Sequence, residues 1–160
     1  MFSSLAHRIT DRSYCTTRTR RSFMTEQNNL SSICEEKFIQ SFVRKEKQDR
    51  LMSFSKNIKN RKKFTSSLVN PKNIDGRHIQ HIPSGSQTAS RIEALLKKNG
   101  APDACYVISE HTRMDQIQSD LSLILPQVVG SGISSIICCI PGKLVYYEGE
   151  EPGERYFLIN

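Results

Sequence analysis

The stretch at residues 133–148 constrains the fold more than any other, and it reads ISSIICCIPGKLVYYE. The β-branched and aromatic runs on either side of Pro141-Gly142 predict a β-hairpin. In the first run both alternating sets of side chains are largely apolar: Ile133, Ile137 and Cys139 on one face, and Ile136, Cys138 and Ile140 on the other. A strand that is apolar on both faces must be covered on both, so we expect it in the middle of a sheet.

Hydrophobic periodicity and turn residues predict the other elements. We expect a basic helical arm over 32–69, as a helical hairpin or one long bent helix, a linker over 70–87 and a short helix at 88–98. A strand at 104–109, an amphipathic helix at 121–129 and a strand at 155–159 complete the chain. The fold class is α+β, with a small mixed four-stranded sheet in the order α-β-α-β-β-β, covered by helices. Its β-α-β unit should have parallel strands.

These boundaries divide the chain into four parts. Residues 1–31 form a disordered basic tail or a targeting segment, 32–69 the arm, 70–87 the linker and 88–160 a small α+β domain. Residues 1–23 hold five arginines, eight Ser/Thr and one acid, which is the composition of a mitochondrial transit segment. A basic tail, or an extension ahead of a true start at Met24, fits the same composition.

Charge is distributed unevenly along the chain. Residues 1–82 carry 17 Lys/Arg against 7 Asp/Glu, whereas residues 83–160 carry 6 against 9. A basic half joined to a weakly acidic half suggests an electrostatic arm that binds nucleic acid or an acidic protein through residues 44–63. A solvated basic helix explains the same charge. The partner-binding candidates are Lys56, Lys59, Arg61, Lys62 and Lys63.

A ligand site, if one exists, is expected in two loops beyond the carboxyl ends of the parallel strands, at 109–113 and 139–143. Glu110, His111 and Cys139 are the catalytic candidates, as carboxylate, base and nucleophile, and Arg113 and Lys143 are the ligand-binding candidates. Cys139 packed in the sheet and His111 in a solvated turn are the alternative. The sequence contains no phosphate loop, dinucleotide fingerprint or zinc spacing, so we expect no cofactor and no metal.

The five cysteines include no CxxC pair and follow no secretory signal peptide, so we expect reduced thiols in the cytoplasm, or in mitochondria if residues 1–23 are a transit segment. The uncharged stretch 121–142 is as long as a membrane span, but its prolines, glycines and change of period argue against one. The strand at 155–159 is expected at a sheet edge, where it would pair with a second copy.

The sequence thus favours a small non-enzymatic binding module whose basic arm docks a macromolecular partner, with nucleic acid as one candidate. The alternative is a small enzyme with its site in the loops at 109–113 and 139–143.

Overall fold

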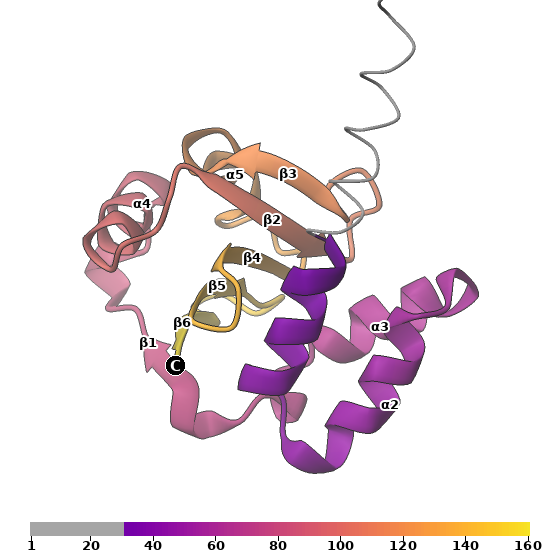
Figure 1. Cartoon of the computed structure of the whole chain (residues 1–160). Helices are drawn as coiled ribbons and strands as arrows, with labels where there is room; N and C mark the ends of the chain where they lie inside the picture. Colours follow the sequence, from indigo (N-terminus) through magenta and orange to yellow (C-terminus); the bar gives the residue numbers. More distant parts are fainter. Residues whose placement is uncertain (1–30) are drawn as a thin grey trace, which may run out of the picture. The chain divides into compact units, whose positions relative to one another are not determined.

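The computed structural model describes residues 31–160, and the predictions for the tail and for residues 1–23 lie outside them. The described residues form an α+β fold with a six-stranded antiparallel sheet in the order β1-β6-β5-β4-β2-β3 (Figure 1). The strands are β1 Ile79–His81, β2 Ala104–Ser109, β3 Ile117–Asp120, β4 Ser135–Ile140, β5 Leu144–Glu148 and β6 Arg155–Ile159. The helices are a helix over 31–42, α2 Lys45–Ser55, α3 Arg61–Leu68, α4 Ala89–Lys98 and α5 Leu121–Val128. Short 3-10 turns occur at Ile58–Asn60, Pro71–Asn73, Gly76–His78 and Ser84–Ser86.

Helices cover both faces of the sheet. The helix at 31–42, α2 and α3 share one apolar cluster with one set of strand side chains. On the other face, α4 and α5 share a second cluster with the alternate set. Figure 1 shows α4 and α5 on one side of the strands and the 31–42 helix on the other. The period-2 alternation of each strand therefore divides its apolar side chains between two cores.

The predicted hairpin at 133–148 is confirmed as β4 and β5. Ile136 and Cys138 pack in the first cluster, whereas Ile137 and Cys139 pack in the second, and all four are at most 4 % exposed. Ile140 does not join Ile136 as expected but packs with the second cluster. The reason is a register shift between Cys138 and Ile140, where a β-bulge changes the face that the next side chain occupies.

Gly142 allows the hairpin turn to lie against the helix at 31–42. Its φ is +70°, and a Cβ at this position would lie 2.9 Å from Ser41 Oγ and 3.4 Å from Lys37 Cβ. Gly100 has a similar φ of +86° but no neighbouring atom within 4 Å of such a Cβ. The two glycines therefore share a backbone requirement, and Gly142 has a steric one in addition.

We expect Gly142→Ala to lower the free energy of unfolding by more than Gly100→Ala does. The left-handed backbone costs an L-residue about 1–2 kcal/mol at either position, and only at Gly142 does the new methyl group press on the helix. Urea denaturation of both variants measures the difference. Equal losses would contradict the close contact between the turn and the helix.

The prediction of a mixed sheet with parallel strands is wrong, because the sheet is antiparallel throughout. The strand β3 was not predicted; it pairs with β2 and reverses the chain before α5 begins. With this extra reversal, β4 returns antiparallel to β2, so that Ser109 faces Ser135 and Tyr106 faces Cys138. The end of β2 thus lies beside the start of β4 and not beside its end.

The segment at 70–87, expected as a linker, contributes β1 to the sheet. β1 pairs with β6, and Ile79 faces Leu158. Consequently β6 lies between β1 and β5 and is not the edge strand through which we expected pairing with a second copy. Residues 32–69 are likewise not a separate arm. Phe38, Phe42 and Phe64 are fully buried in the cluster that covers the sheet.

Candidate functional site

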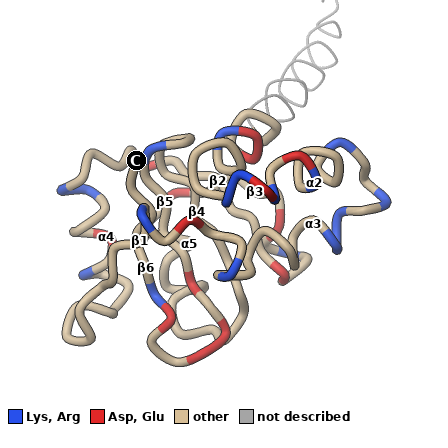
Figure 2. The backbone as a smooth tube through the Cα atoms, turned by 90° about the horizontal axis from the view of Figure 1, so that it is seen from below, with Lys and Arg blue, Asp and Glu red and all other residues tan. Residues whose placement is uncertain are grey.

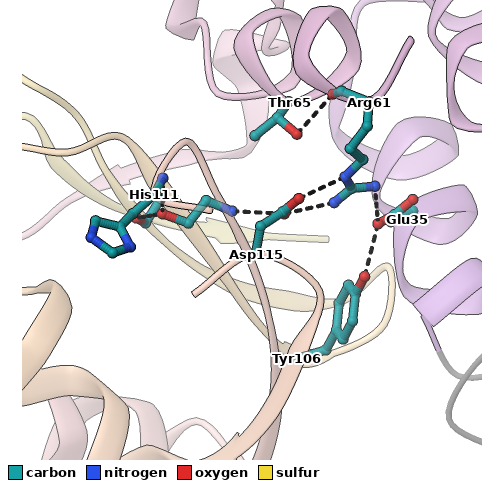
Figure 3. Close-up of polar contacts among 8 residues, drawn as sticks. Glu35, Arg61, Thr65, Tyr106, His111 and Asp115 are labelled. Atoms are coloured by element: carbon teal, nitrogen blue, oxygen red, sulfur yellow. Dashed lines mark hydrogen bonds and ion pairs between the residues drawn. The ribbon is translucent and has the colours of Figure 1, made fainter. Parts of the chain in front are cut away.

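Arg61, one of the predicted partner-binding residues, is the centre of a partly buried ionic cluster that we call the Arg61 cluster: Glu35, Arg61, Tyr106 and Asp115 (Figure 3). Its guanidinium donates to both carboxylate oxygens of Asp115 at 2.7 Å and to Glu35 Oε1 at 2.6 Å. The Tyr106 hydroxyl donates to the same Glu35 oxygen at 2.8 Å. Arg61 therefore joins α3 to the helix at 31–42 and to the turn after β2, and it is not free to bind a partner.

The electrostatics of the Arg61 cluster follow from its burial. Loss of water raises the pKa of Glu35, although the charge of Arg61 opposes this effect. Burial, reinforced by the charge of Glu35, also raises the pKa of Tyr106. Tyr106 is thus a neutral donor, and every group of the cluster is occupied by another member. The arrangement holds three elements together and presents no unoccupied acid, base or nucleophile.

The position of Glu35 in the sequence carries a signal from which its burial could be predicted. Glu35 precedes Phe38, Ile39 and Phe42 by three, four and seven residues, so it belongs to the apolar face of its helix. It is only 4 % exposed. A carboxylate on an apolar face requires a buried partner. Asp115 lacks such a pattern, because it lies in a turn.

The other four predicted partner-binding lysines remain at the surface. Together with Ile58 they form what we call the basic tip, at the connection between α2 and α3: Lys56, Ile58, Lys59, Lys62 and Lys63. All four lysines are exposed, and Ile58 is 77 % exposed. Figure 2 shows basic residues gathered at this connection. Within residues 31–160, none of the four lysines has an ion-pair partner.

The aromatic residues beside the basic tip belong to the fold. Phe64 is fully buried, and the guanidinium of Arg61 lies 5.0 Å from its ring centre. Phe54 is partly buried against the same core, and the Arg50 guanidinium lies 5.3 Å from its ring centre. Phe64 is therefore closed to a base, and Phe54 exposes only part of its ring. The basic tip therefore offers charge and one aliphatic side chain.

The two loops predicted to form a catalytic or ligand-binding site lie at opposite ends of β4. Residue 109 faces Ser135 at the start of this strand, whereas Cys139 lies four residues farther along, about 14 Å at a rise of about 3.4 Å per residue. Glu110 and His111 therefore do not lie beside Cys139, as the prediction of a catalytic site required. Arg113 and Lys143 are both exposed, one in each of these separated loops.

Each of the three catalytic candidates has its own surroundings. Cys139 is 4 % exposed, and its thiol donates to the Ile137 carbonyl at 3.8 Å. The backbone N–H of His111 donates to Ser109 Oγ at 3.1 Å, while its enclosed Nδ1 has no hydrogen-bond partner among the described residues. Glu110 accepts a hydrogen bond from Ser66.

A cavity of about 610 Å³ lies between the end of α3 and the turn after β5. Its charged lining is mostly acidic and consists of Lys72, Glu110, Glu150, Glu151 and Glu154. In residues 31–160, no three His, Cys, Asp or Glu side chains are arranged to hold a metal ion. Every helix in this part of the chain is also too short or too polar to cross a bilayer.

Glu148 differs from the acidic residues that follow it. It is 2 % exposed and accepts hydrogen bonds from Arg155 Nε at 3.0 Å and from the Gly130 N–H at 2.9 Å. The Tyr146 hydroxyl also donates to it. In the sequence, Glu148 resembles the start of a solvated acidic turn. Because it lies in β5 two positions after Tyr146, its side chain points to the same covered face of the sheet as the Tyr146 side chain.

No protein family, curated protein or solved structure matches this chain. The function must therefore be inferred from the described residues themselves.

Proposed function

We propose that this chain is a non-enzymatic docking module that binds nucleic acid through the basic tip. The observation that carries the proposal is the exposure of four lysines without a carboxylate partner in residues 31–160. Between residues 56 and 63 the sequence has five basic and no acidic residues. A local excess of unpaired positive charge attracts a polyanion.

The spacing of the lysines supports a phosphate backbone as the partner. Lys62 and Lys63 lie in the first turn of α3, and Lys59 lies in the 3-10 turn just before it, so three lysines fall within five residues. Like charges held this close repel each other. A row of phosphates removes this repulsion and releases its own counterions on binding.

The side chains of the basic tip also predict that it does not distinguish one nucleic-acid sequence from another. Lysine is a point charge without the planar fork by which arginine recognises a base. Phe64 is buried in the core and Phe54 is partly buried against it, so the tip presents little aromatic surface. We therefore expect contacts to phosphates, which position a protein but carry no sequence information.

Fluorescence titration of a labelled 20-nucleotide RNA and a DNA duplex at two salt concentrations tests the proposal. If four phosphates are neutralised, the affinity for the duplex should fall by about 100-fold between 50 and 200 mM salt. Replacing Lys56, Lys59, Lys62 and Lys63 with glutamine should remove most of the binding at low salt.

The control replaces four exposed lysines elsewhere with glutamine: Lys37, Lys72, Lys98 and Lys143. Both variants lose the same charge, so the five arginines in residues 1–23 contribute equally to each. The control should keep most of the affinity. Equal losses in the two variants, or no binding of the unmodified chain at low salt, would overturn the proposal.

The alternative of an enzyme with a site in the loops at 109–113 and 139–143 receives no support from the geometry. The two loops lie at opposite ends of β4. Cys139 is buried in the core of the sheet. We therefore retain the binding module as the function that the residues favour.

A further inference from the structure

A cavity of about 410 Å³ lies between α3 and the turn that follows β2. Lys62 and Thr65 line it from α3. Ser109, Glu110 and Thr112 line it from the end of β2 and from the turn. Ligand pockets in proteins usually have volumes of about 300–1,000 Å³, so this cavity has room for a small ligand or for one ring of a larger one.

The wall of this cavity combines hydrocarbon with a few polar atoms. Every lining residue has a polar side chain, yet most of the surface that they present to the cavity is carbon. Side-chain stems and threonine methyl groups must therefore form most of the wall. The Arg61–Asp115 ion pair lines the cavity as well and is satisfied within the Arg61 cluster (Figure 3). A largely apolar wall with few free polar groups suits a flat ring with one hydrogen-bonding edge.

Glu110 provides the free acceptor of the cavity. Its Oε1 accepts a hydrogen bond from Ser66, and no described residue donates to its Oε2. A carboxylate only accepts hydrogen bonds, and it is matched best by a partner with two N–H groups side by side. The ring that the cavity favours is thus one with neighbouring N–H donors on its edge.

Lys62 connects the cavity to the basic tip, because it belongs to both. It is exposed and has no ion-pair partner within residues 31–160. Glu110 also lines the larger cavity, where Glu150, Glu151 and Glu154 repel phosphates. A polyanion that reaches the smaller cavity is therefore expected to approach it from the basic tip.

We propose that the 410 Å³ cavity binds one unpaired guanine of a single-stranded nucleic acid, an inference that rests on the proposed binding of phosphates by the basic tip. The pairing edge of guanine presents two neighbouring donors, N1–H and N2–H, to the Glu110 carboxylate. Uracil and thymine present one N–H between two carbonyl oxygens, which a carboxylate repels. Adenine and cytosine present one amino group beside a ring nitrogen that has no hydrogen. Guanine is therefore the base that Glu110 selects.

A guanine within a duplex cannot use this site. Its N1–H and N2–H groups are already bonded to cytosine, and its ring is stacked between its neighbours. Proteins read the pairing edges of bases in single strands, where the bases are free to leave the stack. The basic tip thus provides affinity without sequence information, and the cavity beside it adds a preference for guanine at one position.

The test compares two labelled RNAs of about 12 nucleotides at low salt, one with uridine at every position and one with a single central guanosine. The full-length chain should bind the guanosine-containing strand about 10-fold more tightly, which is the discrimination that a good two-bond contact to a base provides. After each strand is annealed to its complement, the two affinities should be equal.

Glu110→Gln should reduce this 10-fold ratio to nearly one, because the amide replaces one of the two acceptor oxygens with a donor. Glu46→Gln is the matched control. Glu46 is exposed on α2 and does not line the cavity, so its substitution removes the same charge and should keep the ratio.

The outcomes separate the guanine site from the proposed function. Equal affinity of the unmodified chain for the two single strands would overturn the guanine site and leave the basic tip as a phosphate-binding surface. A full preference for guanosine in Glu110→Gln, or an equal loss of preference in Glu46→Gln, would overturn it as well. If neither strand binds at low salt, the proposed function fails and the guanine site fails with it.

Discussion

Replacing Arg61 with methionine is expected to lower the free energy of unfolding by about 3–5 kcal/mol. Methionine keeps much of the side-chain volume but leaves the carboxylates of Glu35 and Asp115 without their cation. The Glu35 side chain is 6 % exposed and that of Asp115 is 13 % exposed, so water replaces the lost charge poorly. Urea denaturation at pH 7 measures the loss.

Lys62→Met is the matched control, because it removes the neighbouring cation from the same helix. Lys62 is exposed and has no ion-pair partner within residues 31–160, so its loss should change stability by no more than about 0.5 kcal/mol. A rescue variant adds Glu35→Gln and Asp115→Asn to Arg61→Met. It should recover most of the stability, since the uncompensated charges are gone and the hydrogen-bond acceptors remain. No recovery would mean that packing, and not charge, is the function of Arg61.

The pH dependence of the free energy of unfolding gives a second measure of the charge interactions in the Arg61 cluster. Burial raises the pKa of Glu35 in the folded state, so this group binds protons more tightly folded than unfolded. Its contribution to stability is fully present below its unfolded pKa and is lost as the pH rises through the folded value. Without Arg61 the folded pKa should rise further. The deficit of Arg61→Met should therefore shrink between pH 7 and pH 5, and a constant deficit would contradict the explanation.

Arg155→Met should cost about 3 kcal/mol or more, since it leaves Glu148 buried without a cation. Arg155 Nε donates to both oxygens of Glu148, at 3.0 and 3.1 Å, and its guanidinium also donates to Gln87 Oε1 at 3.0 Å. The Glu148 side chain is 3 % exposed. The loss should appear as a lower urea midpoint, because β5, β6 and the segment before α4 all meet at this ion pair.

The same substitution at an exposed ion pair provides the control. Arg77 donates to Asp75 at 2.6 Å, but its side chain is 83 % exposed. Arg77→Met should leave the urea midpoint almost unchanged, because a surface ion pair contributes little. Adding Glu148→Gln to Arg155→Met should restore part of the loss. If Arg77→Met and Arg155→Met are equally destabilising, burial does not determine the strength of these pairs.

The elements that the sequence predicted correctly are those with strong local patterns. The central hairpin has β-branched and aromatic runs around Pro141-Gly142, and α4 has a helical stripe that ends before Gly100. The helix at 121–128 was also predicted, despite the proline at 126. In each case neighbouring residues contain the whole signal, so distant contacts change little.

The missed features depend on contacts between distant residues. β3 has a single large apolar residue, Ile117, and β1 reads Ile-Gln-His, so neither resembles a strand by itself. Pairing with β2 and with β6 makes them strands. Arg61 likewise looks like its lysine neighbours in sequence. Only the fold brings Glu35 and Asp115, 26 and 54 positions away, to its guanidinium.

The position of β6 in the sheet has a consequence for how the chain folds during synthesis. The last strand in sequence separates β1 from β5, so the backbone groups of residues 79–81 have no partner strand until residues 155–159 have left the ribosome. Pairings between such distant segments are slow to form, and unpaired strands are prone to aggregate meanwhile. A nascent chain that stops before Arg155 lacks the strand that joins β1 to the rest of the sheet. The sheet is therefore completed only when residues 155–159 are free to pair with β1 and β5.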